Sequence, residues 1–475
     1  KQINIVIIYM YSYTNNIKNK EADAYAILIC STFHKNIKAI EKKLSVTFPD
    51  KMINYFSDEQ KKISKHFVGD KLFLIAKVNE KKCSMEDLDH KIGDICSLIK
   101  GDKKINKVVF LLAPIKNYIR YQTIRTVHHM YDYKNNKNFN IIFCAVSKLK
   151  SVVMQSVKEG AILNKLRTMV NQPANIMTTD AFLKTVKSFK HKHLSLEVFN
   201  KKRLKKDKFN LILGVNQGSE QEPYLLTVKW MPKKKQNPIV IVGKGVMFDT
   251  GGINLKYGDF TDMKTDMTGA ATAWSLIKLC AINNIQKNVV ALIPIVENMI
   301  GSKAQRPGDV VESYSGKTVE ITNTDAEGRL IMADAIAYSE KFNPKFIIDI
   351  ATLTGQASSI FNKLAIVAMG NYKPLIETYE EACHEVNEKM WEMPLWKEYR
   401  KFLNSEVADI QNAALKSSSG TITAAMFLKE FVPRKTHWLH LDIAGVAFKK
   451  GTATGGSLLS IFELLKKPHL KNVSI

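Results

Sequence analysis

The stretch Asn323-Thr324-Asp325-Ala326-Glu327-Gly328-Arg329-Leu330 brings two carboxylates, a glycine and an arginine close together in the chain. Apolar and small residues follow it at helical spacing, at Ala333, Ile336, Ala337 and Tyr338. We therefore expect Asp325, Glu327 and Arg329 to lie on a loop at the N-terminus of a helix. Free backbone N–H groups and the helix dipole favour an anion at such a position, and Arg329 adds a positive charge. The alternative is an acidic capping loop whose arginine pairs with its own neighbours.

A second segment, residues 242–256, reads Val-Gly-Lys-Gly-Val-Met-Phe-Asp-Thr-Gly-Gly-Ile-Asn-Leu-Lys. It continues the apolar run 239–242, which predicts a short buried strand that ends in glycines. Lys244 and Asp249 should therefore follow a strand. Further along, Asp266 precedes a run of small residues that predicts a helix to about Leu279, and we expect Thr268 to cap that helix.

Together these segments resemble the leucyl (cytosol) aminopeptidase family of two-metal exopeptidases. The octapeptide 323–330 is highly specific to that family, and the segment from Lys244 to Lys256 supports the resemblance independently. The resemblance extends from about residue 160 to the C-terminus. It implies a variable N-terminal α/β domain, a linking helix and a C-terminal catalytic domain.

The pattern of apolar runs agrees with an α/β fold in both halves. Residues 1–155 predict a small α/β domain with a largely parallel sheet and no catalytic constellation. The expected strands of this part are 3–11, 26–30, 71–76, 107–112 and 140–145. The run 3–11 is too short to span a bilayer, so we expect no membrane association.

A long helical pattern over 151–170, ended by Pro173, reads as a connector. We expect an N-terminal domain over 1–155, a linking helix and turn over 156–180, and a catalytic domain over 181–475. The catalytic part should hold a central, mainly parallel sheet, with the site where strands end. Its expected strands are 239–242, 289–296, 346–353 and 438–443.

The carboxylates of these segments predict a metal centre. If Asp249, Asp266, Asp325 and Glu327 meet in one cleft, they repel one another unless cations neutralise them, and two divalent ions match their charge. The resemblance implies that Lys244, Asp249, Asp266 and Glu327 hold one ion, and that Asp249, Asp325 and Glu327 hold the other. Lys244 can bind a metal only as the neutral amine. We expect zinc or manganese, with magnesium or cobalt as alternatives.

The implied reaction is hydrolysis of the first peptide bond by a hydroxide that bridges the two metals. By resemblance, Lys256 stabilises the oxyanion of the tetrahedral intermediate, and Arg329 holds a bicarbonate ion that shuttles protons. The alternative for Lys256 is an exposed lysine on a glycine-rich loop. The loop 256–266 looks about a residue shorter than in typical members, so Asp259 and Asp262 compete with Asp266, although the spacing favours Asp266.

Substrate binding is expected from two further places. The segment 349–355 would bind the peptide through backbone groups, with Thr352, Leu353 and Gly355 as the contacting residues. Met263 would help to line an apolar pocket that favours leucine-like first residues, with ordinary core filling as the alternative.

Composition leaves further functions open. The net charge of +25 fits either a lysine-biased genome or binding of nucleic acid, which is one alternative function. A scaffold that retains the fold without activity is another. The six cysteines are scattered, which is typical of free thiols in a reducing compartment, so we expect a cytoplasmic protein. The resemblance implies a homo-hexamer that acts on peptides.

Overall fold

The structure is a computed structural model, and it describes residues 10–14, 22–30, 41–42, 47, 63–78, 84–112, 118–133, 139–145, 147–414 and 417–468. The chain forms two compact units, residues 1–164 and 165–475. Over the described ranges, none of the helices combines the length and the apolar character that a membrane crossing requires. Cys96, Cys280 and Cys383 are free thiols, and these three and Cys144 are all buried.

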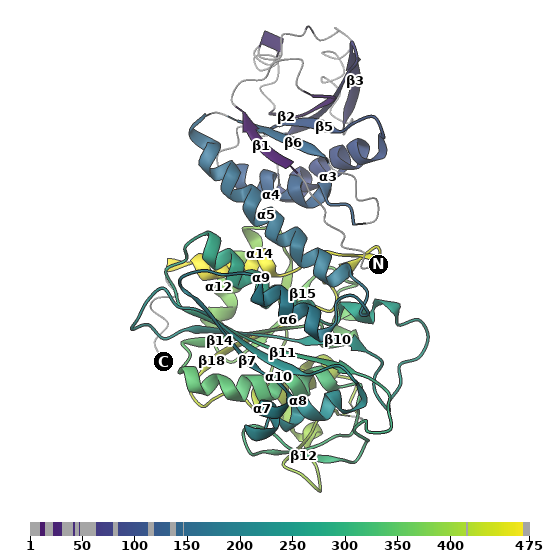
Figure 1. Ribbon diagram of the computed structural model, residues 1–475, viewed down its shortest axis with the longest axis vertical. Coiled ribbons are helices and arrows are strands. Elements are labelled where there is room, and N and C mark those ends of the chain that lie inside the picture. The colour runs from purple at the N-terminus through teal and green to yellow at the C-terminus, as the bar shows by residue number, and fades with distance from the viewer. Residues whose placement is uncertain are drawn as a thin grey trace. The chain divides into compact units, whose positions relative to one another are not determined.

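The first unit is built on a six-stranded sheet in the order β1-β6-β5-β2-β4-β3 (Figure 1). All its strand pairings are parallel except that of β3 with β4. The predicted strands at 26–30, 71–76, 107–112 and 140–145 are confirmed; of the run 3–11, residues 3–9 lie outside the described residues. The elements are β1 Met10–Thr14, β2 Ala24–Cys30, β3 Ser64–Val68, β4 Lys71–Val78, α3 Met85–Gly101, β5 Lys107–Leu111, α4 Ile119–Met130 and β6 Asn140–Cys144.

The expected connector is helix α5, Lys150–Asn171. It ends two residues before Pro173, because proline lacks the N–H group that a continuing helix needs. The predicted helix over 151–170 is therefore confirmed. The boundaries of the functional domains at residues 155 and 180 stay a prediction.

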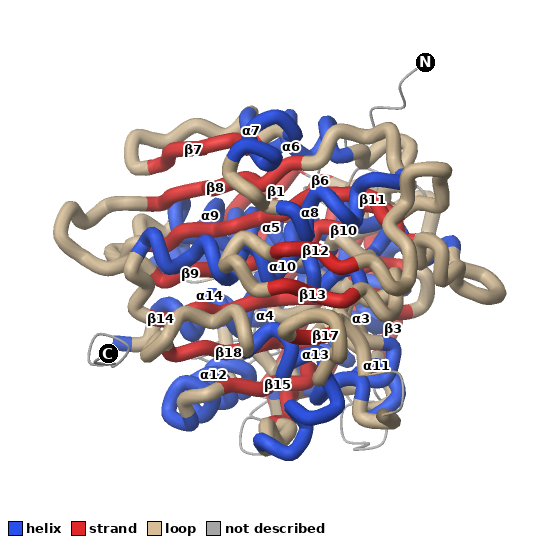
Figure 2. Tube along the Cα trace, turned by 90° about the horizontal axis from the view of Figure 1, so that it is seen from below, coloured by secondary structure: helices blue, strands red, loops and turns tan. Residues whose placement is uncertain are grey.

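The second unit is organised around a nine-stranded sheet in the order β16-β15-β18-β14-β9-β11-β8-β7, and β10 also pairs with β11 (Figure 2). The central strands β18, β14, β9 and β11 run parallel, which confirms the mainly parallel sheet. Its strands are β7 Leu194–Phe199, β8 Tyr224–Trp230, β9 Ile239–Gly243, β10 Gly245–Asp249, β11 Val289–Asn298, β14 Phe346–Ala351, β15 Ile366–Gly370, β16 Met390–Glu392 and β18 His437–Asp442.

Smaller elements complete this unit. A three-stranded sheet has the order β12-β13-β17, and β19 pairs with β20. The short strands of these two sheets are β12 Val310–Glu312, β13 Thr318–Glu320, β17 Ile410–Gln411, β19 Phe448–Lys449 and β20 Thr452–Ala453. The helices of the second unit are α6 Thr179–Lys187, α7 Lys201–Lys206, α8 Asn210–Val215, α9 Thr268–Ile282, α10 Glu327–Tyr338, α11 Gly355–Ile360, α12 Lys373–His384, α13 Gly420–Lys429 and α14 Leu458–Lys466.

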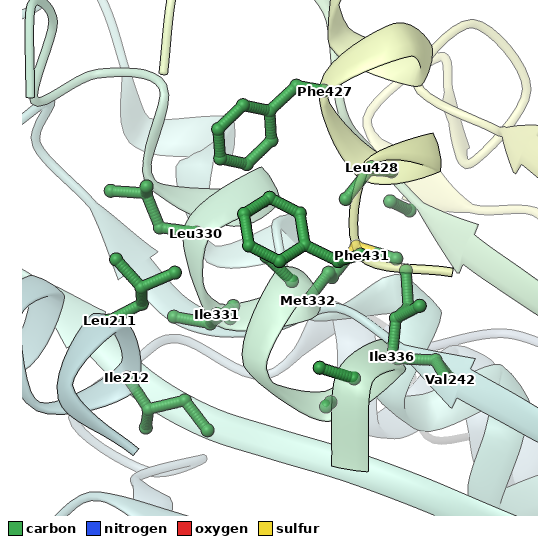
Figure 3. Close-up of a cluster of buried hydrophobic side chains, with 14 of the residues drawn as sticks. Leu211, Ile212, Val242, Leu330, Ile331, Met332, Ile336, Phe427, Leu428 and Phe431 are labelled. Carbon is green, nitrogen blue, oxygen red and sulfur yellow. The ribbon is translucent and has the colours of Figure 1, made fainter. Parts of the chain in front are cut away.

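Helix α10 lies within the core, and every one of its residues is buried. In Figure 3, its side chains Leu330, Ile331, Met332 and Ile336 lie among residues of α8, β9, α13 and the turn after α13. The surrounding side chains labelled in Figure 3 are Leu211, Ile212, Val242, Phe427, Leu428 and Phe431. Packing on several sides fixes the helix firmly, and its N-terminus carries the acidic octapeptide.

Two expectations about helix starts were wrong in detail. Glu327 and Arg329 lie in the first turn of α10 rather than on the loop before it. Thr268 does not cap α9, because its hydroxyl donates to Thr265 O (2.6 Å) and the cap position is Met267. A backbone contact takes over part of the capping, since the Ala270 N–H donates to Lys244 O (2.8 Å).

Asp334, which is fully buried, ties α10 to its neighbours. Its carboxylate accepts hydrogen bonds from the backbone N–H groups of Leu211 (3.0 Å), Ile212 (3.2 Å) and Tyr314 (2.8 Å). The N–H groups of Leu211 and Ile212 lie in the first turn of α8, where backbone N–H groups have no acceptor within the helix.

We expect Asp334→Ala to lower the free energy of unfolding by about 3 kcal/mol, because two buried N–H groups and one partly buried N–H group lose their acceptor. Urea denaturation would measure this loss. Asp207→Ala is the matched control, since Asp207 is partly exposed and makes a long contact with Arg203 (3.4 Å); it should cost less than about 1 kcal/mol. Equal midpoints for the two variants would contradict the role given to Asp334.

Candidate metal centre

Lys244 lies at the break between β9 and β10, both of which pair with β11. Its backbone is fixed on two sides, because its N–H donates to Ile350 O (3.0 Å) and its carbonyl accepts from the Ala270 N–H (2.8 Å). Gly269 makes this close approach of strand and helix possible, since a Cβ there would lie 2.1 Å from Ile350 O. The buried Lys244 side chain therefore starts from a rigid point at the end of the sheet.

The turn after β10 returns Lys256 to the strand end. Gly251 and Gly252 adopt φ values of +89° and +66°, which favour glycine. The Gly251 N–H donates to Asp249 Oδ1 (2.9 Å), and the Lys256 N–H donates to Thr250 O (2.9 Å). The Lys256 ammonium then lies 2.8 Å from Asp249 Oδ2 and also contacts the Asp325 carboxylate.

The start of α10 brings the remaining carboxylates to the same place. Asp249, Asp325 and Glu327 each offer an oxygen within 4.8 Å of the other two. Lys244 Nζ joins this group to Asp266, lying 2.9 Å from Glu327 Oε1 and 2.8 Å from Asp266 Oδ2. Gly328 leaves room for the lysine, because a Cβ there would lie 2.3 Å from Lys244 Cε.

The charge of this cluster fits divalent cations. Two ammonium groups offset only half of the charge of four carboxylates, and most of the cluster is buried. Asp266 Oδ2 and Glu327 Oε1 are buried and, over the described ranges, accept no hydrogen bond of good geometry, although Lys244 lies within ion-pair distance of both. Carboxylate oxygens with one amine form a donor set that suits manganese, magnesium or zinc. The residues present therefore fit two bound metal ions.

The cluster also shifts its own pKa values. Burial and the nearby Glu327 raise the pKa of Asp249 to about 7, against the opposing effect of Lys256 and Lys244. Burial alone would lower the pKa of Lys244, but Asp266 and Glu327 outweigh it and hold the pKa above its ordinary value. An amine ligand must be neutral, so metal binding at Lys244 requires that its proton leave.

Arg329 offers an unused donor beside the cluster. It is 8% exposed, and its Nη1 donates to Asn412 O (2.9 Å), while its Nε has no hydrogen-bond partner in the described part of the chain. Burial lowers the pKa of this guanidinium to about 10, which still leaves it charged at neutral pH. A buried guanidinium with a free N–H suits a small oxyanion such as bicarbonate.

The expected substrate-binding residues lie in two places: the segment after β14, and the turn that leads to Asp266. Thr352 belongs to the cluster, because its hydroxyl donates to Asp266 Oδ1 (2.8 Å) and its carbonyl accepts from Lys244 Nζ (2.9 Å). The Leu353 N–H donates to Asp442 Oδ1 (3.1 Å) at the end of the neighbouring strand. Gly355 is exposed at the start of α11, and Met263 is half-buried in the turn that leads to Asp266.

The competing carboxylates of the 256–266 loop lie elsewhere. Asp259 is exposed and accepts from the Thr261 N–H (2.9 Å), as a turn residue does. Asp262 is exposed as well. Of the three aspartates, it is Asp266 that contacts Lys244.

Residues 164–460 match the cytosol aminopeptidase family, catalytic domain. The chain belongs to this family. The resemblance seen in the two motifs is thereby confirmed, and membership places the chain among metal-dependent aminopeptidases.

Individual members are similar over most of the chain. A probable cytosol aminopeptidase of Phytoplasma australiense is 43% identical over 351 residues, which are 72% of this chain and 71% of the relative. One of Agrobacterium fabrum is 44% identical over 300 residues, 62% of this chain and 60% of the relative. A leucine aminopeptidase of Caenorhabditis elegans superimposes with a TM-score of 0.84 at 25% identity, covering 97% of this chain and all of that one.

The fold also matches that of the bottromycin maturation enzyme BotP, solved in complex with Mn. Its TM-score is 0.83 at 23% identity, over 94% of this chain and 99% of that chain. At this identity the match shows a shared fold.

Three polar residues whose roles the sequence did not predict hold the aminopeptidase cluster in place, and one of them, Thr324, belongs to the octapeptide itself. Asn298, buried at the end of β11, donates to Asp249 Oδ1 (2.8 Å) and Thr324 O (3.0 Å). The Thr324 hydroxyl donates to Gly251 O (2.6 Å), and Asn412 Nδ2 donates to Asn323 O (2.7 Å). For Asn298 a signal existed, since it is a polar residue just after an expected buried strand that ends at the same sheet edge.

We expect Asn298→Ala to weaken metal binding by about 10- to 100-fold, because Asp249 loses the amide that orients it. Calorimetric titration of Mn²⁺ into chelator-treated protein would measure the change. Gln286→Ala removes an exposed amide and is the matched control, which should bind Mn²⁺ like the unmodified chain. Unchanged affinity in Asn298→Ala would show that Asp249 needs no such support.

Proposed function

We propose that the protein removes the first residue of peptides, with a preference for leucine-like residues, at two divalent ions held by the cluster. The observation that carries the proposal is the convergence of Asp249, Asp325 and Glu327 within 4.8 Å, joined through Lys244 to Asp266. Lys244, Asp249, Asp266 and Glu327 would hold one ion, and Asp249, Asp325 and Glu327 the other. When bound, such a pair supplies Lewis-acid polarisation of the scissile carbonyl and an activated water.

In this proposal, Lys256 would act on the reacting carbonyl. Its ammonium contacts Asp249 and Asp325. Burial alone would lower its pKa, but these carboxylates together with Glu327 raise it, so the side chain stays charged. A fixed positive charge at this position stabilises an oxyanion as it develops.

Arg329 would bind bicarbonate through its unused Nε. Bicarbonate held there would accept and return a proton during hydrolysis. Thr352 contributes to positioning, because its hydroxyl fixes Asp266 and its carbonyl fixes Lys244. With Leu353 and Gly355 it begins the segment that would run beside the peptide.

The preference for leucine-like residues rests on Met263. It is half-buried in the turn that delivers Asp266 to the cluster, and a thioether adapts its shape to branched aliphatic side chains. Zinc or manganese as the resident metals, a homo-hexamer, a cytoplasmic location and any binding of nucleic acid stay predictions from the sequence.

Removal of metal should abolish hydrolysis of a leucyl chromogenic amide, because four carboxylates then lack their counter-charge and the carbonyl lacks its Lewis acid. Dialysis against a chelator, followed by addition of manganese or zinc, would test this by the return of activity. Full activity after chelation, or none under any of the metals, would contradict the proposal.

Lys256→Met should lower kcat by about 10²- to 10³-fold with little change in KM, because it removes a charge that acts mainly in the transition state. Steady-state kinetics on the same amide would separate the two constants. The control is Lys264→Met, a nearby half-buried lysine outside the cluster, which should keep its kcat. A rise in KM at constant kcat would assign Lys256 to ground-state binding instead.

A further inference from the structure

A pocket of about 520 Å³ lies beside β12, separate from the residues of the metal centre. Its walls come from α7, α8, the turn after α8, β12 and the loop before β12. The apolar part of the lining is aliphatic and includes Leu213, Val310 and Val311. No aromatic ring lines it among the residues that the structure describes.

The strand β12 lies at the edge of its small sheet, and Val310 and Val311 of this strand line the pocket. Asp309 O accepts from the Ile321 N–H (2.8 Å) on the β13 side, and Glu312 O accepts from Asn210 Nδ2 (2.9 Å) on the other side. Because backbone groups alternate along an antiparallel strand, the N–H and C=O of Val310 point away from β13. Val310 lines the pocket, so an edge is available there for one more extended segment.

Gln305 adds an unsatisfied amide to the pocket wall. It is 4% exposed, and neither its Nε2 nor its Oε1 has a hydrogen-bond partner among the residues that the structure describes. A buried amide without hydrogen-bond partners costs free energy. If the Gln305 side chain changes its rotamer to meet a ligand, new hydrogen bonds between the amide and the ligand would recover this cost. Gly214 packs closely against it, because a Cβ there would lie 2.8 Å from Gln305 Oε1.

Two lysines contribute positive charge to the pocket lining. These are Lys201 and Lys205 of α7, and both are exposed. Neither is ion-paired within the described part of the chain. The carboxylate in the lining, Asp309, is already occupied by Arg306, whose N–H lies 2.8 Å and whose Nη2 lies 2.9 Å from it.

We propose that this pocket binds an acidic peptide in an extended conformation. One residue of the peptide would exchange backbone hydrogen bonds with Val310, and a neighbouring residue, whose groups face the opposite side, would meet the Gln305 amide. Acidic side chains would reach Lys201 and Lys205, and aliphatic ones would contact Leu213 and Val311. A nucleotide fits less well, because bases are usually held by stacking on aromatic rings.

The test uses the full chain and a fluorescent peptide of alternating glutamate and valine. Its amino end is acetylated, so it has no free α-amine to act as an aminopeptidase substrate. Fluorescence anisotropy should show saturable binding to the unmodified chain. Gln305→Met and the double variant Lys201→Glu/Lys205→Glu should each weaken binding by about tenfold or more. Lys233→Glu/Lys234→Glu makes the same charge change on another exposed loop and should alter binding by less than about twofold.

A second variant keeps the test independent of any folding defect in Gln305→Met. Gly214→Ala favours the helix α8 and places a methyl group against the Gln305 amide, so it should weaken peptide binding while the thermal midpoint holds or rises. The proposal is overturned by the absence of saturable binding up to about 1 mM peptide. Equal losses in the Lys233→Glu/Lys234→Glu control, or displacement of the peptide by adenosine monophosphate at lower concentration than by unlabelled peptide, would also overturn it.

Discussion

The cluster at the candidate metal centre exists only because the fold holds four carboxylates together against their mutual repulsion. Asp249, Asp266, Asp325 and Glu327 come from three separate stretches of chain, and most of the group is buried. Lys244 and Lys256 offset part of the charge through contacts with two carboxylates each. Such a cluster is unstable unless the surrounding structure holds it and cations complete the charge balance, so much of the second unit can be read as its support.

That support is mostly backbone and amide hydrogen bonding at the ends of parallel strands. Strand β11 supplies Asn298, β14 supplies the Ile350 carbonyl that fixes Lys244, and α10 supplies Glu327 from its first turn. Burial of α10 on all sides sets the position of that turn, because a helix packed among α8, β9 and α13 cannot shift without opening the core. The position of the acidic octapeptide is therefore set by contacts with residues that are distant from it in the sequence.

The sequence predicted the features that rest on local pattern and on specific motifs. The central strands were identifiable because buried parallel strands are short continuous apolar runs, as at 239–242 and 346–353. The cluster was identifiable because its residues fall in motifs typical of one family. The capping of α9 could not be predicted from Thr268, since the Lys244 carbonyl that meets the Ala270 N–H is distant in sequence. The role of Asn412 was hidden for the same reason, because an asparagine acquires its partners only when the chain folds. Asn298 left a signal, as a polar residue just after a buried strand, but its bond to Asp249 also joins distant parts of the sequence.

Glycine explains how so dense a cluster can form. At Gly328 a side chain would overlap Lys244, and at Gly269 it would collide with the backbone of β14. Gly251, with φ of +89°, lets the chain turn so that Lys256 faces Asp249 and Asp325. Each of these positions brings a charged group or a backbone closer than any residue with a Cβ would allow. The distances between the charged groups thus depend on glycines as well as on the charged side chains. Replacement of any one of these glycines should therefore disturb the whole cluster rather than a single ligand.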